Sequence, residues 1–339
     1  MRIWFNHWFS TAYHLINLIR EGNPDRFYFV GSNKNDYAIY KRACDEWHRE
    51  PEKISEESYV DFCLEFCRAH GINIFVPRRF LTAIAGRRED FEKIGVKVLV
   101  GKDAGLMKIL DDKVATYKFI AAGGAEEVIP PYRLAKNFDE FNRAYNELKT
   151  SDNRICYKLV EDEGALTFRV IDDTIENISA LHNMPNMKLT FAAAQKILAR
   201  YDFKIPLLVM PYLSGQEISI DCLTTPRGNI IIPRFKTNNR YSEIKFDDEI
   251  ISAAEKILSL TKIDVPINIQ FRMDGKNFYL LEINPRMSGG LQLSCLASGI
   301  NIPDLAINRL LGVDKLWTVP DKKFCRVANI ETPIIIEDF

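Results

Sequence analysis

The chain has 339 residues, of which 47% are apolar and 27% are charged, with 45 Lys and Arg against 46 Asp and Glu. These values are close to the averages for globular chains and exclude wholesale disorder, collagen-like and coiled-coil architectures. The formal charge of -1 gives no general attraction to nucleic acid or to an acidic membrane surface, so we expect neither as a partner.

The first hundred residues predict alternating strands and helices. Strands are expected at 2–6, 26–33, 72–77 and 96–101, and helices at 12–22 and 56–71. The run 72–77 is almost continuously apolar, which is typical of a strand buried on both faces of a parallel sheet. We therefore expect a Rossmann-like α/β domain over residues 1–108. A G-x-G-x-x-G motif is missing after the first strand, which disfavours a nicotinamide oxidoreductase.

The pattern changes beyond about residue 105. A helical stretch is expected over 105–124, and residues 126–149 predict a short strand, a Pro-Pro break and a helix. Residues 154–236 then predict alternating strands around an Ala-rich helix, and a further helix is expected at 248–260. Two strands joined by an Asp-Gly turn follow. We expect an α+β domain with antiparallel hairpins over 109–315, and a C-terminal segment, 316–339, that packs on the core.

The cysteines and histidines predict no metal site. Seven cysteines lack a close C-x-x-C pair, which favours reduced thiols over disulfides or zinc ligands. Cys63 and Cys67 lie one helical turn apart among apolar neighbours and are expected on a buried helix face. The five histidines form no H-x-H or H-E-x-x-H motif. Polar residues such as Asn6 interrupt the apolar N-terminus, so we expect no membrane span or signal peptide and a cytoplasmic location.

The strongest chemical signal lies in the last predicted hairpin. Glu282 and Asn284 alternate with apolar residues, so on a strand both side chains face the same way. Gln270 lies on the partner strand, and Arg286 follows directly after Pro285. Carboxylate and amide oxygens suit magnesium, and a guanidinium suits a phosphate oxygen. The alternative is a solvated polar face on which Arg286 forms a surface ion pair with Glu282.

These residues resemble a known family. The segment LLEINPR, 280–286, resembles the metal-binding strand of ATP-grasp enzymes, the superfamily of carbamoyl phosphate synthetase large subunits, biotin carboxylase and D-alanine ligases. Asp112-Lys113 resembles the D-K pair that opens the ATP-grasp domain, and YKLV resembles its phosphate-binding strand. VMPYLSGQEISIDCLT, 209–224, resembles the hinge strand that holds adenine. The resemblance covers roughly residues 1 to 312 and implies an ATP-grasp fold preceded by a Rossmann-like domain.

The resemblance also implies roles for single residues. Mg-ATP would bind between two lobes of the ATP-grasp domain, with ATP and Mg²⁺ as cofactors. Glu217 would receive the ribose hydroxyls, and Gln270, Glu282 and Asn284 would hold magnesium. The adenine pocket would be lined by Met210, Pro211, Tyr212 and Leu213, and the phosphates would be contacted by Lys113, Lys158 and Arg286. A homodimer is also consistent with the family.

The reaction implied is activation of a carboxylate. ATP would phosphorylate a small-molecule carboxylate to an acyl phosphate, which an amine or another nucleophile attacks, so that the chain would be an ADP-forming ligase. Arg234, Lys236 and Arg240 are expected to form a cationic collar for the γ-phosphate or the acyl substrate, or else to be solvated. Residues 288–290 predict either an anion-binding nest or a tight turn.

One departure supports a different function. The loop after Lys158 has a single glycine, Gly164, where the family has several, and Glu161, Asp162 and Glu163 would repel phosphate. The alternative is therefore an ATP-binding regulatory or degenerate module with little ligase activity. Neither the carboxylate nor the nucleophile is identified by any motif.

Overall fold

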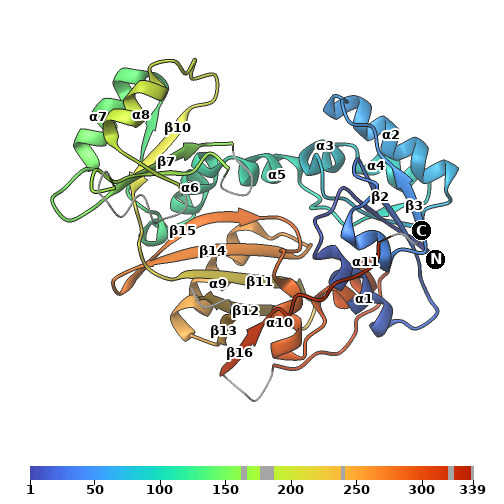
Figure 1. Cartoon of the computed structure of the whole chain (residues 1–339). Helices are drawn as coiled ribbons and strands as arrows, with labels where there is room; N and C mark the ends of the chain where they lie inside the picture. Colours follow the sequence, from blue (N-terminus) through green and yellow to red (C-terminus); the bar gives the residue numbers. More distant parts are fainter. Residues whose placement is uncertain (162–165, 176–186, 238–240, 320–323, 337–339) are drawn as a thin grey trace. The chain divides into compact units, whose positions relative to one another are not determined.

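The computed structural model describes residues 1–161, 166–175, 187–237, 241–319 and 324–336. The chain forms two compact units (Figure 1). Unit 1 contains Met1–Leu110, Gln216–Phe271 and the chain from Glu282 onward, whereas unit 2 contains Asp111–Gly215 and Arg272–Leu281. The domain boundaries expected at residues 108 and 315 stay predictions. No helix in the described ranges has the length and apolar character needed to cross a bilayer.

Unit 1 begins with a parallel five-stranded sheet in the order β3-β2-β1-β4-β5. Its strands are β1 (Arg2–Asn6), β2 (Tyr28–Asn33), β3 (Glu46–Arg49), β4 (Ile74–Val76) and β5 (Lys97–Val98). The accompanying helices are α1 (Ala12–Gly22), 3-10 helix η1 (Ile39–Ala43), α2 (Glu56–Ala69), α3 (Leu81–Gly86), α4 (Arg88–Lys93) and α5 (Ala104–Asp111). The predicted parallel α/β layer is thus confirmed. Strand β3 and helices α3 and α4 lack a clear periodic signal and were not predicted.

Aromatic packing holds α2 against this sheet. Trp4, on the central strand β1, stacks on Phe66 of α2 and on Phe75 of β4, with ring centroids 4.2 and 4.3 Å apart. Cys63 and Cys67 are buried on the same helix, as predicted. Their burial raises the pKa of both thiols, which makes them packing residues rather than reactive groups.

An antiparallel sheet has the order β15-β14-β11-β12-β13-β16, and it belongs to unit 1 apart from Arg272–Leu281, the part of β14 and β15 that is assigned to unit 2. Its strands are β11 (Glu217–Thr225), β12 (Gly228–Lys236), β13 (Tyr241–Lys245), β14 (Ile267–Asp274), β15 (Asn277–Asn284) and β16 (Phe324–Ala328). The helices of this part are α9 (Asp248–Thr261), α10 (Leu291–Ser298) and α11 (Ile302–Leu310). The predicted Asp-Gly turn is confirmed between β14 and β15, where Gly275 adopts a φ of +60°.

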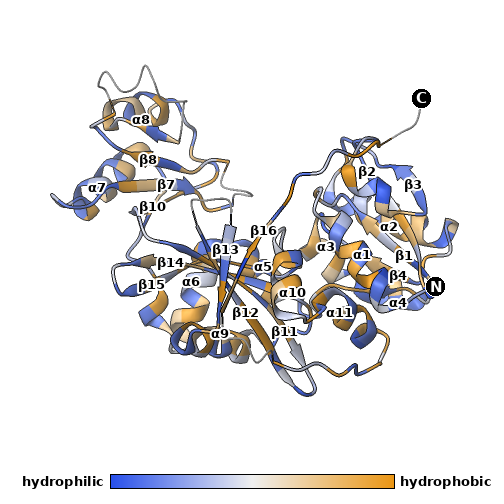
Figure 2. Cartoon of the chain, turned by 60° about the horizontal axis from the view of Figure 1, so that its bottom comes forward, coloured by the Kyte–Doolittle hydropathy of each residue, from blue (hydrophilic) through white to orange (hydrophobic). Residues whose placement is uncertain are grey.

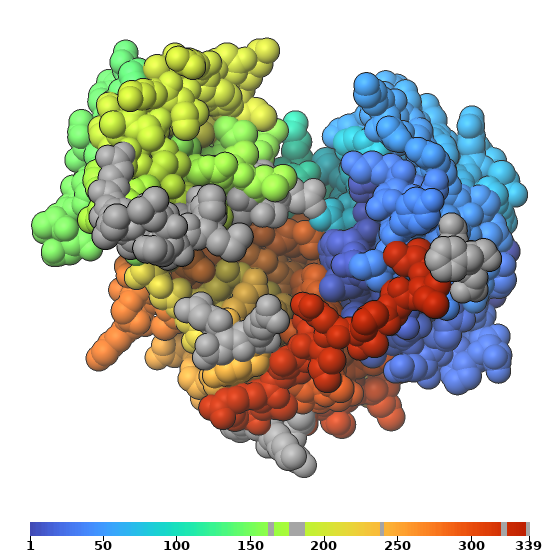
Figure 3. Space-filling view, viewed as in Figure 1, coloured from blue at the N-terminus to red at the C-terminus, as the bar shows by residue number. Residues whose placement is uncertain are grey.

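The two sheets of unit 1 share one apolar core. Ile3 and Phe5 of the parallel sheet belong to the same buried cluster as Ile232 of β12 and Ile307 of α11. Figure 2 shows β12 as a largely hydrophobic strand. Figure 3 shows the described part of the C-terminal segment on the surface of this unit, where Ile330 is 90% exposed.

Unit 2 is built on a five-stranded sheet in the order β6-β10-β7-β8-β9. Its strands are β6 (Arg133–Ala135), β7 (Ile155–Leu159), β8 (Arg169–Ile171), β9 (Lys188–Leu189) and β10 (Leu207–Pro211). The helices are α6 (Lys113–Ala122), 3-10 helix η2 (Glu126–Val128), α7 (Phe138–Leu148) and α8 (Phe191–Leu198). The rings of Tyr145 and Phe191 stack at 3.8 Å and join α7 to α8.

Two local expectations for unit 2 differ from the structure. The helical stretch over 105–124 is divided, because the carboxylate of Asp112 caps α6 by accepting from the amides of Val114 and Ala115. The short strand expected before the Pro-Pro break is the 3-10 helix η2, and β6 follows the prolines instead. A proline has no N–H to donate to a sheet ladder, which favours pairing of the residues beyond Pro131.

Candidate active site

A chain of hydrogen bonds joins the acid, the amide and the cation at the end of β15. Asn284 Nδ2 donates to Glu282 Oε1 at 2.9 Å, and Arg286 Nη2 donates to Asn284 Oδ1 at 3.2 Å. Glu282 and Asn284 therefore project from the same face of the strand, which confirms the alternation predicted from the sequence. All three side chains are half-buried, so they can be reached by a ligand while their orientation is held by neighbours.

Gln270 stands on β14, the hydrogen-bonded neighbour of β15 in the sheet. Its Nε2 donates to Asn268 Oδ1 at 3.1 Å. Because the amide nitrogen is engaged in this way, the carbonyl oxygen Oε1 is the atom left for a cation. Gln270, Glu282 and Asn284 thus supply hard oxygen donors, the kind that Mg²⁺ prefers.

A buried polar network lies behind Gln270. Asn268 is 1% exposed and donates to Ser219 Oγ and Asp221 Oδ1, both at 2.9 Å. The hydroxyl of Ser294, on α10, donates to Asp221 Oδ2 at 2.6 Å. These residues were not predicted from the sequence, although the alternation of Ser219 with Asp221 and of Asn268 with Gln270 carries the same period-two signal as Glu282 and Asn284.

Arg234 of β12 completes this network. Its guanidinium is 5% exposed, donates from Nη2 to Ser219 Oγ at 3.0 Å and lies 3.7 Å from Asp221 Oδ2. Its Nε is buried and has no hydrogen-bond partner among the described residues. Arg234 and Lys236 of the predicted cationic collar have different partners. Lys236 lies on the same face of β12 as Arg234 but pairs with Glu217. Arg240 lies outside the described residues.

Residues 288–290, for which an anion-binding nest or a tight turn was predicted, form a turn before α10. The amide of Gly290 donates to Ser288 Oγ at 3.3 Å, and the amide of Leu291 donates to Ser288 O at 3.4 Å. Both hydrogen bonds are internal to a tight turn, one of the two arrangements predicted for this segment.

The parallel sheet adds cations that sequence reasoning missed. In the order β3-β2-β1-β4-β5 the strand order reverses between β1 and β4, and ligands of open α/β sheets bind at the carboxyl ends of strands at such a point. Arg78 and Arg79 follow β4 there. The guanidinium carbons of Arg78 and Arg286 lie 5.5 and 5.7 Å from the ring centre of Phe9, which brings the end of β4 close to the end of β15.

The environment of these arginines is strongly cationic. Burial, followed by the charges of Arg79, Lys34 and Arg78, lowers the pKa of His7 to about 4. Arg79 lies over the ring of Tyr59 at 4.8 Å, and its buried Nη1 finds no hydrogen-bond acceptor in the described part of the chain. A buried guanidinium nitrogen without an acceptor, beside a neutral histidine, favours an anionic ligand.

Unit 2 carries the residues predicted for the nucleotide. Lys158 stands on β7 opposite Leu208 of β10, and Lys113 is buried at the first position of α6. Met210 and Leu213 are buried, whereas Pro211 and Tyr212 are half-buried. The amide of Tyr212 donates to Arg154 O at 2.7 Å. The loop positions Asp162, Glu163 and Gly164 lie outside the described residues.

Comparison with known proteins identifies the fold. A family model described as "ATP-grasp in the biosynthetic pathway with Ter operon" matches residues 203–333, less than half of the chain. The biotin carboxylase domain of 2-oxoglutarate carboxylase from Hydrogenobacter thermophilus matches 95% of this chain and 72% of its own length, with a TM-score of 0.68 and 15% identity. The chain has the ATP-grasp fold, and its residues 203–333 match an ATP-grasp family model. The predicted ATP-grasp fold with a preceding parallel sheet is confirmed.

Two further known proteins are similar to this chain. An L-amino acid ligase from Bacillus licheniformis matches 91% of this chain and 74% of its own, with a TM-score of 0.63 and 13% identity. The carbamoyl phosphate synthase large chain of Clostridium beijerinckii is 30% identical over 129 residues, which cover 33% of this chain. The match spans only 12% of that large chain.

Proposed function

We propose that this ATP-grasp protein is an ATP-dependent ligase that activates a carboxylate as an acyl phosphate for attack by an amine or another nucleophile. The observation that carries the proposal is the hydrogen-bonded series Glu282–Asn284–Arg286 at the end of β15. An acid and an amide that share one strand face, beside a guanidinium, match the needs of a magnesium–polyphosphate site. A homodimer stays a prediction.

Magnesium fits the oxygen donors of Gln270, Glu282 and Asn284. Bound Mg²⁺ would neutralise the negative charge that shifts among the phosphate oxygens during phosphoryl transfer. Asn284 donates to Glu282 Oε1 and accepts at its own Oδ1 from Arg286, so the orientation of both metal-ligand candidates is held by neighbouring side chains. Asn268 and Asp221 hold Gln270 from behind, so the donors are set before a ligand arrives.

The nucleotide contacts are assigned to the hinge strand and to two lysines. The amide of Tyr212 is engaged with Arg154, whereas the amide of Leu213 makes no hydrogen bond within the described ranges. Leu213 is therefore the hinge residue whose N–H suits an adenine ring nitrogen. Lys158 and Lys113 are assigned to the phosphates, where a compact ammonium can follow shifting charge. Glu217 is assigned to the ribose, and it pairs with Lys236 in the structure.

The carboxylate substrate is assigned to the arginines. Arg286 is hydrogen-bonded to Asn284, so it can orient an acyl phosphate next to the metal ligands. Arg234 supplies a buried positive charge on the neighbouring strands, held by Ser219. Protein nucleophiles are not needed, because phosphoryl transfer depends on positioning and electrostatics. Among the similar structures, the biotin carboxylase domain is in complex with MgADP, ADP and bicarbonate, and another is an L-amino acid ligase.

The alternative function is an ATP-binding module without turnover, which the glycine-poor loop around Gly164 favours. Phosphate release measured with Mg-ATP over a panel of carboxylic acids and amines separates the two. Acid-dependent release by the wild type that falls at least about 100-fold in Glu282→Gln supports the ligase, since a lost metal ligand removes several kcal/mol of charge stabilisation. Glu255→Gln is the matched control, because Glu255 is exposed on α9. ATP binding without release on the whole panel would identify the module.

A further inference from the structure

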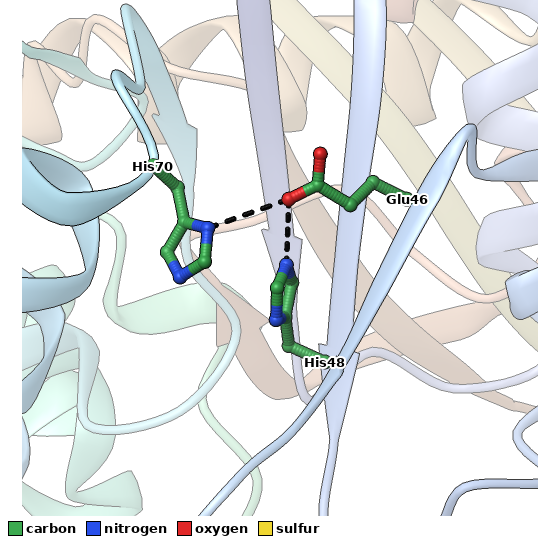
Figure 4. Close-up of side chains that lie close together, drawn as sticks. All are labelled: Glu46, His48 and His70. Atoms are coloured by element: carbon green, nitrogen blue, oxygen red, sulfur yellow. Dashed lines mark hydrogen bonds and ion pairs between the residues drawn. The ribbon is translucent and has the colours of Figure 1, made fainter.

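Strand β3 and the end of α2 bring an acid and two histidines together (Figure 4). His48 Nε2 lies 2.7 Å and His70 Nδ1 lies 3.3 Å from the same oxygen, Oε1 of Glu46. The three ligand atoms all lie within 4.8 Å of one another. None of the three residues belongs to the site proposed for the nucleotide reaction.

The position of each side chain follows from its element. Glu46 and His48 are two residues apart on the edge strand β3, so they face the same side. His70 is the residue that caps the C-terminus of α2. The imidazoles of His48 and His70 lie 4.1 Å apart, and the ring of His70 lies 4.2 Å from that of Phe66. Packing on Phe66 thus orients both histidines toward Glu46.

The second oxygen of Glu46 has its own partner. Arg2 Nη2, on β1, donates to Glu46 Oε2 at 2.5 Å. The carboxylate is therefore held so that Oε1 faces the two imidazoles, the kind of outer-shell support that metal ligands receive in proteins. Each of the three side chains is only 27 to 28% exposed, so the cluster is partly screened from water yet open to an ion.

We propose that Glu46, His48 and His70 bind one divalent transition-metal ion, with zinc as the best fit, and that the ion ties β3 to the C-terminus of α2. Zinc binds His nitrogens and carboxylate oxygens at about 2.0–2.2 Å, which places neighbouring ligand atoms of a tetrahedral site roughly 3.3 Å apart. The separations of 2.7 and 3.3 Å are close to this value. Three protein ligands leave the fourth position for water or for a small anion.

Zinc titration of the full-length chain, freed of metal and of any affinity tag, tests the proposal. Saturating Mg²⁺ is kept present to occupy the oxygen donors of Gln270 and Glu282. We expect one zinc ion per chain, and His48→Gln and His70→Gln each to weaken zinc affinity at least about 100-fold, since losing even an outer-shell partner costs about 10–100-fold. The matched control is His14→Gln, an exposed histidine of α1, which should leave affinity unchanged.

Wild-type protein that takes up no zinc in competition with a chromophoric chelator would overturn the proposal, and so would equal affinity of the wild type and both His variants. The cobalt(II) spectrum of the wild type gives a test that needs no variant. Bands without thiolate charge transfer agree with imidazole and carboxylate ligands, whereas a thiolate band would place the ion on a cysteine and refute the site. Zinc should also raise the melting temperature of the wild type but not that of a folded His70→Gln protein.

Discussion

The guanidinium of Arg234 occupies the space that a side chain at position 290 would need. A β-carbon on Gly290 would lie 2.5 Å from Cζ of Arg234, well inside van der Waals contact. The backbone of Gly290 has a φ of -111°, which any residue can adopt, so the requirement for glycine here is one of space. The first turn of α10 and the buried charge of Arg234 therefore depend on each other.

Gly290→Ala should displace Arg234 and destabilise the protein by about 1–3 kcal/mol, the usual cost of overpacking. Phosphate release should fall with it if Arg234 positions the acyl substrate. Denaturant unfolding and turnover measure the two effects. Gly289→Ala is the control, because a β-carbon there would lie 3.6 Å from Phe9, an ordinary contact, and should leave both unchanged.

Arg79→Gln tests the cations at the carboxyl ends of β1 and β4. If the unpaired Nη1 of Arg79 binds the carboxylate substrate, its loss should raise the KM for that acid about 10–100-fold with little change in the KM for ATP. Steady-state kinetics with each substrate varied in turn gives the two values. Arg87→Gln, at a half-buried arginine paired with Asp61 and Asp90, should change neither. A parallel rise in both constants would contradict a substrate-specific role.

The stability of the chain should depend on pH through His7. Its folded pKa of about 4 lies below the unfolded value of 6.5, so its contribution to stability is complete above pH 6.5 and is lost as the pH falls toward 4. His7→Asn should flatten the pH profile of the melting temperature over this window. Asn suits the site because residue 7 has a φ of +51°, a conformation that Asn tolerates. If the melting temperature of the variant fell with pH as steeply as that of the wild type, groups other than His7 would govern the loss of stability at acid pH.

Asp304→Ala should destabilise unit 1 by about 3 kcal/mol, because it leaves several partners without an acceptor. Asp304 is 5% exposed and accepts from Asn23 at 2.5 Å, from Asn308 at 2.6 Å and from Lys315 at 2.8 Å. Urea unfolding measures the loss. Asp314→Ala removes a surface pair with Arg227 and should cost less than about 1 kcal/mol. Equal costs for the two variants would refute the role given to Asp304.

Much of the fold could be read from local patterns. The strands around Ile3 and Ile74, the helix that Ser55 caps, and the Asp-Gly hairpin all follow from periodicity, capping and turn chemistry that involve neighbours in the chain. The short strand β3 was missed because its four residues carry no such pattern. The break at Asp112 was missed because a capping aspartate inside a helical pattern is recognised only by what its side chain accepts.

The sequence by itself determined that Glu282 and Asn284 share a strand face, since the two-residue period of a strand is a local property. Only the tertiary structure decided that Arg234 joins Ser219 and that His70 lies beside Glu46. Those pairs come from different elements, and which elements become neighbours depends on how apolar faces pack over the whole core. The predicted metal donors were therefore visible in one segment, whereas the network that holds them exists only in the folded chain.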